Sequence, residues 1–524
     1  MAADLQHQEW RPRHSPWLVA LGVMLATFMQ VLDTSIANIA LPHIAGSLSA
    51  TTDQATWVLT SYLVANAIIL PMTGWLGNHF GRKRVFISCI GMFVIASALC
   101  GAAVNLPMLI LARILQGAGG GAMVPIAQAI LLESFPAQKR GIAMATFAQA
   151  VVVAPIIGPT LGGWITDNYS WRWIFYINLP VGLLAIFLAE WLVEDPPYIK
   201  RNLKAAIDFT GFGLLAVWLA TLQIVLDKGQ DADWLGAVWI RWFIIISVVA
   251  MIAFIVWEFR VKDPLVNLRI LKSQNFRTGL MLMTVIGIIL YGTTAELPLF
   301  LQTLMGYPAL QSGYTMSPRG IAAFFTTFLV GRLVGRIPLR WMLGFGFAML
   351  SLSSYMLSGI NLQVSMASVI LPTVLNGVAI SFIFVPLTTA TMSQLRQQEI
   401  GSGTGLYNLM LNLGGSIGIA LVTTLVARGA QTHQALMVGH LTPADPVFTQ
   451  RLAAAQHALG QQTDPVTATH QAYGLIYNTL NAQAHLWAFV DTFRMFGLMV
   501  VCCLPLILLF KRVKRPVVRP AEVH

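Results

Sequence analysis

The sequence predicts an all-α protein embedded in a membrane, and three observations support this fold class. Hydrophobic residues make up 56% of the 524 residues and charged residues only 10%, whereas a soluble domain carries about 25% charged residues. The apolar residues gather in stretches of about 20, the length of a membrane-spanning helix. Most basic residues lie in short loops between these stretches, so the net charge of +11 reflects membrane topology and not nucleic-acid binding.

Fourteen stretches have the length and composition of membrane spans. If the N-terminus is cytoplasmic, the inside segments hold 24 of the 32 basic residues and the outside segments hold five. This asymmetry favours an even number of spans with both termini inside. The predicted limits are 17–38, 55–76, 84–104, 107–131, 142–166, 173–193, 208–226, 238–258, 279–303, 312–335, 341–360, 364–393, 402–427 and 486–510.

A weak internal repeat divides these spans into two halves. GWLGNHFGRKR (Gly74–Arg84) closes the second span and GRLVGRIPLR (Gly331–Arg340) closes the tenth. If the two turns are equivalent, each half has six spans, and spans seven and eight are an insertion. Secondary transporters are often built from such repeats, with the substrate site between them.

The predicted organisation follows from this division. It comprises a cytoplasmic N-terminus (1–16), an N-terminal six-helix half (17–193), two inserted helices (208–258), a C-terminal six-helix half (279–510) that includes a periplasmic loop (428–485), and a cytoplasmic C-terminus (511–524).

The outside segment 428–485 has no apolar run long enough to span a membrane and contains five of the ten histidines. From Val466 onward, apolar residues recur at helical spacing, which predicts an amphipathic helix that runs into the last span. The histidines lack the close pairing with acids that a zinc site shows, so no metal site is predicted. We expect a solvated loop or a docking surface.

One carboxylate lies deep in the first predicted span. Asp33 stands within LATFMQVLDTSIANIALP (Leu25–Pro42), and an ionised Asp at such depth is costly. An acid retained there usually moves a proton, binds a cation or pairs with a buried charge. The alternative is a structural Asp bonded to Thr34 and Asn38. We predict that Asp33 belongs to the coupling machinery of a transporter.

Other charged residues fall at a similar depth in their spans. At 1.5 Å per residue, the six charges lie about 8–12 Å from the outer end of their helices. Acids that face bases in such a layer can exchange a proton for a counter-charge. Asp33 and Glu296 have no basic neighbour in sequence and are the stronger proton-carrier candidates. The remaining members are Arg113, Arg319, Asp491 and Arg494, of which Asp491 and Arg494 are spaced as a structural pair on one helix.

Two glycine-rich segments mark the fourth and fifth spans. In AQAVVVAPIIGPTLGG (Ala148–Gly163), prolines bend the helix and glycines give it a face without side chains, which allows close helix packing. An ordinary kinked packing helix is the alternative. ARILQGAGGGAMVP (Ala112–Pro125) lacks the Lys-Ser/Thr pair of a phosphate loop. Since the chain has no nucleotide-binding loop, we predict no cofactor and expect any active transport to use an ion gradient.

These motifs together resemble the EmrB-like group of fourteen-span drug:proton antiporters in the major facilitator superfamily, over nearly the whole chain. LDTSIANIALP resembles the first-span signature and places its acid on Asp33. LILARILQGAGGG resembles the fourth-span motif and makes Arg113 the buried arginine linked to proton transfer. The loop motif between spans two and three corresponds to Gly74, Asn78, Gly81 and Arg82. The fifth-span antiporter motif corresponds to Gly158, Pro159, Gly162 and Gly163.

The resemblance implies a pump in the bacterial inner membrane that expels lipophilic drugs in exchange for protons. It also implies an EmrA-like periplasmic adaptor and a TolC-like outer-membrane channel as partners. Two positions depart from the family pattern. Asn78 stands where the loop motif usually has Asp, and Leu411 stands where relatives often carry Arg.

The substrate is expected in an apolar, aromatic-lined cavity between the halves. Five residues are predicted to line it: Gln30, Tyr62, Asn66, Gln149 and Tyr291. One alternative is a proton-coupled or facilitated metabolite porter of the same superfamily. A membrane-embedded enzyme is a second alternative, but no H-E-x-x-H or other recognised catalytic constellation is present.

Overall fold

The computed structural model describes residues 12–136, 139–197 and 208–510, and this part of the chain is almost entirely helical. Twelve of its helices are long and apolar enough to cross a membrane. The protein is therefore a multi-pass membrane protein of the predicted all-α class.

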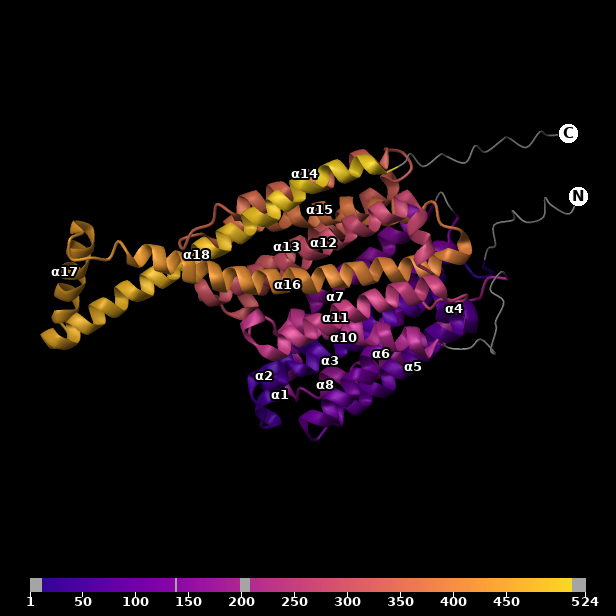
Figure 1. Cartoon of the computed structure of the whole chain (residues 1–524), viewed down its shortest axis with the longest axis horizontal. Helices are drawn as coiled ribbons and strands as arrows, with labels where there is room; N and C mark the ends of the chain where they lie inside the picture. The colour runs from indigo at the N-terminus through magenta and orange to yellow at the C-terminus, as the bar shows by residue number, and fades with distance from the viewer. Residues whose placement is uncertain (1–11, 137–138, 198–207, 511–524) are drawn as a thin grey trace, which may run out of the picture.

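The N-terminal half occupies the lower part of Figure 1. Its longest helices are α1, α6 and α7, and Asn105 begins α6 by accepting a hydrogen bond from the Met108 amide at 2.9 Å. Gly81, with φ of +88°, separates α4 from α5. The helices are α1 (Pro16–Ser47), α2 (Thr52–Ala55), α3 (Trp57–Ile69), a 3₁₀ turn (Leu70–Met72), α4 (Thr73–Phe80), α5 (Arg82–Gly101), α6 (Leu106–Ser134), α7 (Arg140–Asn168), α8 (Trp173–Tyr176) and α9 (Asn178–Leu192).

The C-terminal half lies above it, and α17 projects from one end of the bundle (Figure 1). Its helices are α12 (Gln274–Leu299), a π turn (Phe300–Leu304), α13 (Ala309–Leu333), α14 (Leu339–Leu357), α15 (Met366–Met392), α16 (Ile400–Val438), α17 (Pro446–Gly460) and α18 (Pro465–Cys503). Between the two halves in the chain lie α10 (Phe209–Lys228) and α11 (Val238–Arg260), the two helices that were predicted to be an insertion and are called the inserted pair below.

The inserted pair connects the two halves along one side. Lys228 of α10 donates to the Thr56 hydroxyl beside α3 at 2.6 Å, while Gln223 accepts a hydrogen bond from Ser416 of α16 at 2.9 Å. Much of the outer surface of α11 is apolar and exposed, including Val249 and Ile252. This surface faces lipid in a multi-pass protein.

The twelve qualifying helices are fewer than the fourteen predicted spans. The predicted spans 312–335 and 341–360 do form helices, α13 and α14, but neither is among the twelve. α13 carries Arg319, Arg332 and several hydroxyl side chains, which reduce its apolar character. The count of fourteen therefore stays a prediction.

Three helices extend past the predicted membrane spans. α1 continues to Ser47, beyond the predicted span end at 38, α16 continues to Val438, and α18 begins at Pro465. Apolar composition marks the edge of a membrane, whereas a helix can continue into water. The predicted loop 428–485 is built mainly of helix, and the helix predicted to run from about Val466 into the last span is confirmed as the first part of α18.

Candidate functional site

A buried ion pair lies within the N-terminal half. Arg113 Nη1 of α6 lies 2.7 Å from Asp33 Oδ2 of α1, and the two side chains are 0% and 1% exposed. The Arg113 Nε group also donates to the Val58 carbonyl of α3 at 3.1 Å. At 1.5 Å per residue, Asp33 lies about 21 Å from the Ser47 end of α1, whereas the predicted distance of about 8 Å is its distance from the end of the apolar stretch. The acid is therefore near the middle of its helix.

Polar side chains from three more positions complete this network. Asp33 Oδ1 accepts hydrogen bonds from Gln116 Nε2 at 2.9 Å and from Asn178 Nδ2 at 2.7 Å. Both amides also donate to the Ser97 hydroxyl, at 3.2 and 2.9 Å. The carboxylate thus receives donors from α6 and α9, and α5 supplies the shared hydroxyl.

The structural alternative for Asp33 does not match these contacts. Thr34 donates to the Val31 carbonyl and Asn38 donates to the Thr34 carbonyl, so both are bonded to backbone groups. Gln116 lies one turn from Arg113 on the same face of α6, and Arg113 Nη1 donates to Gln116 Oε1 at 2.7 Å. Asn178 and Ser97 were not predicted, because nothing in the sequence places α9 and α5 beside α1.

Three of the five predicted substrate residues gather beside the ion pair. The guanidinium carbon of Arg113 lies 4.3 Å from the centre of the Tyr62 ring. All three surround Gly120. A Cβ atom added to this glycine would lie 2.8 Å from Tyr62 Oη, 3.4 Å from Asn66 Nδ2 and 3.5 Å from Gln30 Nε2. A glycine here leaves space for a small polar cluster next to Arg113.

The other two predicted substrate residues lie elsewhere. Gln149 of α7 donates to the Phe324 carbonyl of α13 at 3.4 Å, where the two halves meet. Tyr291 of α12 packs against Gly415 of α16. The structure does not bring these two residues to the Arg113 cluster.

Glu296 occupies a different environment in the C-terminal half. It is fully buried in α12, and neither of its carboxyl oxygens has a hydrogen-bond partner among the described residues. One turn before it, Gly292 packs against Phe496 of α18; one turn after it, the Phe300 ring meets Phe489 of α18. Residues one turn apart share a helix face, so Glu296 faces α18.

The remaining charges of the predicted layer are separate again. Asp491 of α18 lies 2.9 Å from His433 of α16 and 3.5 Å from Arg494, and about half of each Asp491 and Arg494 side chain is exposed. Arg319 of α13 donates to the Thr294 hydroxyl at 2.7 Å. Similar depth along their helices does not bring charged residues together, because the helices that carry them can lie far apart in the plane of the membrane. The six charges accordingly divide into separate sites.

The loop motif joins the two halves at one end of the bundle. Gly74 of α4 lies directly against Ser402 of α16, so that a Cβ atom at position 74 would overlap the backbone of that residue. Asn78 Nδ2 donates to the Gln398 carbonyl at 3.4 Å. Arg82 is buried at the start of α5 and forms an ion pair with Glu133 of α6.

The second glycine-spaced turn makes the reciprocal contact. Gly331 of α13 approaches Ala145 of α7: a Cβ atom added to Gly331 would lie 2.8 Å from the Ala145 Cβ. Val334 lies against Gly141 of α7. The turn of each half thus packs against the first residues of a helix in the other half. This reciprocity is the structural meaning of the internal repeat.

The fifth-span motif packs α7 against α1. Gly158 lies directly against Ser35, and a Cβ atom at Gly162 would meet Ile36 Cγ2 at 2.9 Å. Gly163 has nothing within 4 Å of such an atom, so it lies outside the close contact that was expected to include it. Pro159 lies within α7, but its side chain is outside the described part of the structure.

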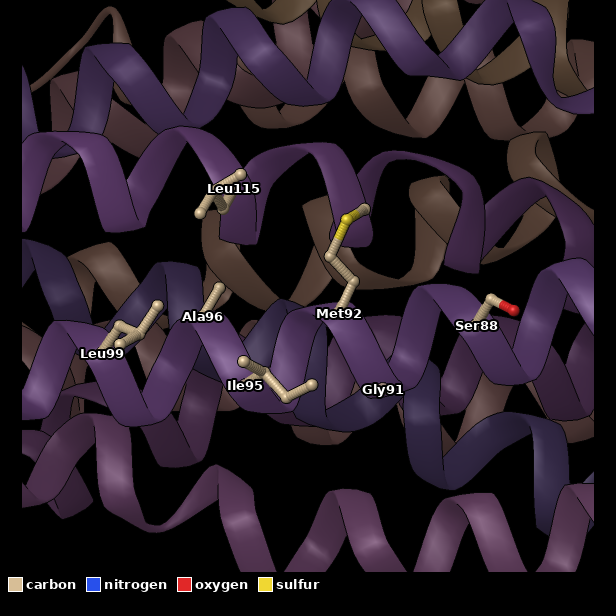
Figure 2. Close-up of a pocket in the computed structure, with 7 residues that line it drawn as sticks. All are labelled: Ser88, Gly91, Met92, Ile95, Ala96, Leu99 and Leu115. Carbon is tan, nitrogen blue, oxygen red and sulfur yellow. The ribbon is translucent and has the colours of Figure 1, made fainter.

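An apolar groove of about 410 Å³ lies between α5 and α6 (Figure 2). Its wall includes Ile95 and Leu115, which are 65% and 48% exposed. The groove is therefore on the outer surface of the N-terminal half. The lining residues are Ser88, Gly91, Met92, Ile95, Ala96, Leu99 and Leu115, and none of the five predicted substrate residues is among them.

Comparison with known families decides the identity of this fold. Residues 23–419 match the family described as Major Facilitator Superfamily. The chain belongs to the major facilitator superfamily. This is a family of transporters and not of enzymes, as the sequence predicted.

Several characterised members of the superfamily are similar over most of this chain. The fatty acid resistance protein FarB of Neisseria gonorrhoeae is 36% identical over 498 residues, which are 94% of this chain and 96% of FarB. The multidrug export protein EmrB of Haemophilus influenzae is 38% identical over 432 residues, 82% of this chain and 84% of that protein. EmrB of Escherichia coli (strain K12) is 36% identical over 446 residues, 84% of this chain and 86% of EmrB. The chain is thus an EmrB-like member of the superfamily.

Solved structures show the same fold at low sequence identity. The human organic anion transporter MFSD10 has a TM-score of 0.61 at 13% identity, covering 93% of this chain and all of MFSD10. The proton:xylose symporter XylE has a TM-score of 0.55 at 13% identity, covering 92% of this chain and 94% of XylE.

Proposed function

We propose that this protein is a drug:proton antiporter that exports lipophilic compounds across the bacterial inner membrane. The observation that carries the proposal is the Asp33–Arg113 ion pair, buried at mid-helix in a chain similar to EmrB and FarB. A fully buried carboxylate with a cationic partner is costly to build and is typical of proton relays in transporters.

The network offers a way to couple proton and substrate. Protonation of Asp33 would remove its charge and release Arg113, which stacks on Tyr62 beside Gln30 and Asn66. Substrate binding to this cluster and protonation of Asp33 would then both change the contacts of the same side chains. Coupling follows if the two ligands favour different conformations of the halves.

Glu296 is proposed as a second proton carrier in the C-terminal half. Its carboxyl group has no partner to lose when it takes up a proton. Asp491, which pairs with His433 and Arg494 at an exposed position, is a third candidate. Exchange between inward- and outward-facing states would use the loop motif and the Gly158 contact as packing points.

We further propose fourteen spans with the loop motifs on the cytoplasmic side. In support, the first and last described segments both lie at the loop-motif end: the Arg13 amide donates to Glu194, and Arg340 donates to the Phe510 carbonyl. A reporter fused near Ala444 should be external. Fusions near Asn202 and after Arg519, which lie outside the described residues, should be internal. An internal signal at Ala444 would overturn the span count.

The projecting arm, defined as residues 428–485, is proposed to dock an EmrA-like periplasmic adaptor in a tripartite system with a TolC-like channel. The arm extends beyond the bundle in Figure 1 and exposes large apolar side chains, among them Leu436, Val447 and Tyr473. Such exposure outside a membrane is typical of interaction surfaces.

Trimming Pro443–Pro465 should leave drug binding by the purified protein intact and reduce resistance in cells. Equal resistance with and without the segment would count against docking.

The deciding experiment is drug efflux from proteoliposomes under an imposed proton gradient. Wild-type protein should accumulate drug against its gradient only when protons flow the opposite way. Substrate binding to the purified protein should also release protons, which a uniporter or symporter of a metabolite would not do. A resistance profile of a pump-deficient host that expresses the chain would identify the compounds. Transport that proceeds equally without a proton gradient would contradict antiport.

A further inference from the structure

A polar pocket of about 370 Å³ lies at the loop-motif end of the molecule. Three separate parts of the chain form its walls: the end of α4, the segment after α11, and the residues around the start of α16. The pocket therefore touches both halves and the inserted helices. Residues from these three parts include Trp75 and His79, then Lys262, Asp263 and Arg269, then Arg396 and Glu399.

The pocket carries an excess of positive charge. His79 Nε2 lies 3.0 Å from the Asp263 carboxylate, and Arg396 Nε lies 3.6 Å from the Glu399 carboxylate, so each acid already has a partner. Lys262 and Arg269 are exposed at the pocket, and neither forms an ion pair with any described residue.

The pocket also contains a hydrogen-bond donor without an acceptor. Trp75 is only 4% exposed, stacks on the His79 ring at 4.5 Å, and lines the pocket. Its indole N–H has no hydrogen-bond partner among the described residues. Buried donors are rarely left unsatisfied, and such a donor usually indicates an acceptor that binds there. Trp75, Lys262 and Arg269 line one pocket, so an anionic group bound there has two cations and an unsatisfied donor as candidate partners.

The position of the pocket matches that of lipid headgroups. Its walls stand where α4 ends at Phe80, where α11 ends at Arg260 and where α16 begins, which are the ends of helices that cross the membrane. The neighbouring surface of α11 exposes Val256 and Phe259, an apolar path for acyl chains. Basic pockets between membrane helices on the cytoplasmic side are known to favour anionic headgroups.

We propose that this pocket binds the phosphate group of an anionic phospholipid. Lys262 and Arg269 attract the phosphate, and the Trp75 indole N–H donates to one of its oxygens. A lipid held there joins the loop motif, the linker of the inserted helices and the start of α16. It stabilises the arrangement in which the two halves are in contact at this end. The proposal does not depend on drug export.

The experiment measures lipid binding to the delipidated full-length protein in an uncharged detergent, by native mass spectrometry and by the shift in thermal unfolding. The ligands are dioleoyl phosphatidylglycerol, dioleoyl phosphatidylcholine with the same acyl chains, and inorganic phosphate. Wild-type protein should prefer phosphatidylglycerol to phosphatidylcholine. The K262Q/R269Q variant should lose affinity for phosphatidylglycerol by about thirtyfold, because each basic residue contributes about fivefold to attraction of anionic lipid. Trp75→Phe should weaken binding about tenfold by removing the donor alone.

The matched control is K272Q/R277Q. Lys272 lies in the same connection between α11 and α12, and Arg277 lies in the first turn of α12. Both are exposed, have the same charges as Lys262 and Arg269, and do not line the pocket. This variant should bind phosphatidylglycerol like the wild type. Competition by inorganic phosphate alone would support the phosphate site and assign it to a soluble ligand. Equal binding of the two lipids by wild-type protein, or equal binding of phosphatidylglycerol by wild type and K262Q/R269Q, would overturn the proposal.

Discussion

The two halves of this transporter bury a carboxyl group in opposite ways. Asp33 of the N-terminal half accepts hydrogen bonds from Arg113, Gln116 and Asn178. Glu296 of the C-terminal half is equally buried and accepts none from the described residues. Ionising a buried carboxyl group without a partner costs far more than ionising a paired one. Loss of charge should therefore remove an ion pair at Asp33 and remove no ion pair at Glu296.

The largest effect is expected from Arg113→Ala. It leaves Asp33 as a buried charge without its cationic partner, which should lower the free energy of unfolding by about 3–5 kcal/mol. Efflux driven by a proton gradient should be abolished. Thermal unfolding and proteoliposome transport check both effects. Adding Asp33→Asn to this variant should restore stability in part but not transport. If Arg113→Ala unfolds like the wild type, the ion pair contributes little to the fold.

Asp33→Asn alone should be milder for stability and equally severe for coupling. Asparagine keeps an oxygen that can accept from Gln116 and Asn178, and Arg113 keeps its bonds to Gln116 and Val58. The variant should fold and bind neutral lipophilic drug, yet lose proton-driven efflux. Expression must be matched to the wild type in the assay. Wild-type transport by this variant would make Asp33 structural and leave the proton to Glu296 or Asp491.

A packing change on α7, which contacts α1, tests whether the network needs α1 in place. Gly158→Leu puts a side chain where Ser35 lies, which should separate α7 from α1 and abolish export without preventing membrane insertion. Gly163→Leu is the matched control, because nothing lies within 4 Å of the added atom. Drug resistance at equal expression distinguishes the two variants. Normal export by Gly158→Leu would show that the contact between Gly158 and Ser35 is ordinary packing and is not required for transport.

Glu296→Gln should have a smaller effect than any change in the N-terminal network. No hydrogen bond or ion pair is removed, so thermal stability should stay within about 1 kcal/mol of the wild type. Transport of cationic drugs should fall, since the carboxylate that would compensate their charge is gone, while neutral drugs are affected less. Parallel efflux assays with both classes make the test. A stability loss comparable to that of Arg113→Ala would show that Glu296 has partners after all.

The smallest effect concerns α18, the helix that covers Glu296, at its projecting end. Asp464 caps α18, and hydrogen bonds from the Thr467 side chain and from the Thr467 and Val466 amides lower the pKa of its carboxyl group. A lowered folded-state pKa stabilises the cap above the unfolded value of about 4, and this is lost as pH falls through the folded-state pKa.

Asp464→Ala should therefore weaken amide hydrogen-exchange protection of the first turn of α18 near pH 7. The difference from the wild type should vanish at pH values below the pKa of the folded protein. Asp445→Ala is the control: Asp445 caps α17 by accepting from the Val447 amide at 2.8 Å, so its effect should stay on α17. A pH-independent difference at α18 would rule out the carboxylate as its cause.

Sequence reasoning located single residues better than it located their neighbours. Asp33, Arg113 and Glu296 were identified because a charge within an apolar stretch is visible in the sequence. Asn178 and Ser97 were missed because they reach Asp33 from α9 and α5, and the lateral order of helices is not encoded in hydropathy. The extent of α1 was not predicted either: its last turns, up to Ser47, include the buried residues Ile44 and Ala45 beyond the predicted span.

The continuity of α16 has a mechanical consequence. One uninterrupted helix of 39 residues begins beside the Gly74 contact and ends in the projecting arm. At 1.5 Å per residue this rod is about 58 Å long, so a rigid tilt of about 10° at one end displaces the other by about 10 Å. If α16 moves as a rigid body, a small rearrangement where the halves meet produces a large displacement of the arm. The position of a protein bound to the arm would therefore depend on whether the transporter is open to the inside or to the outside.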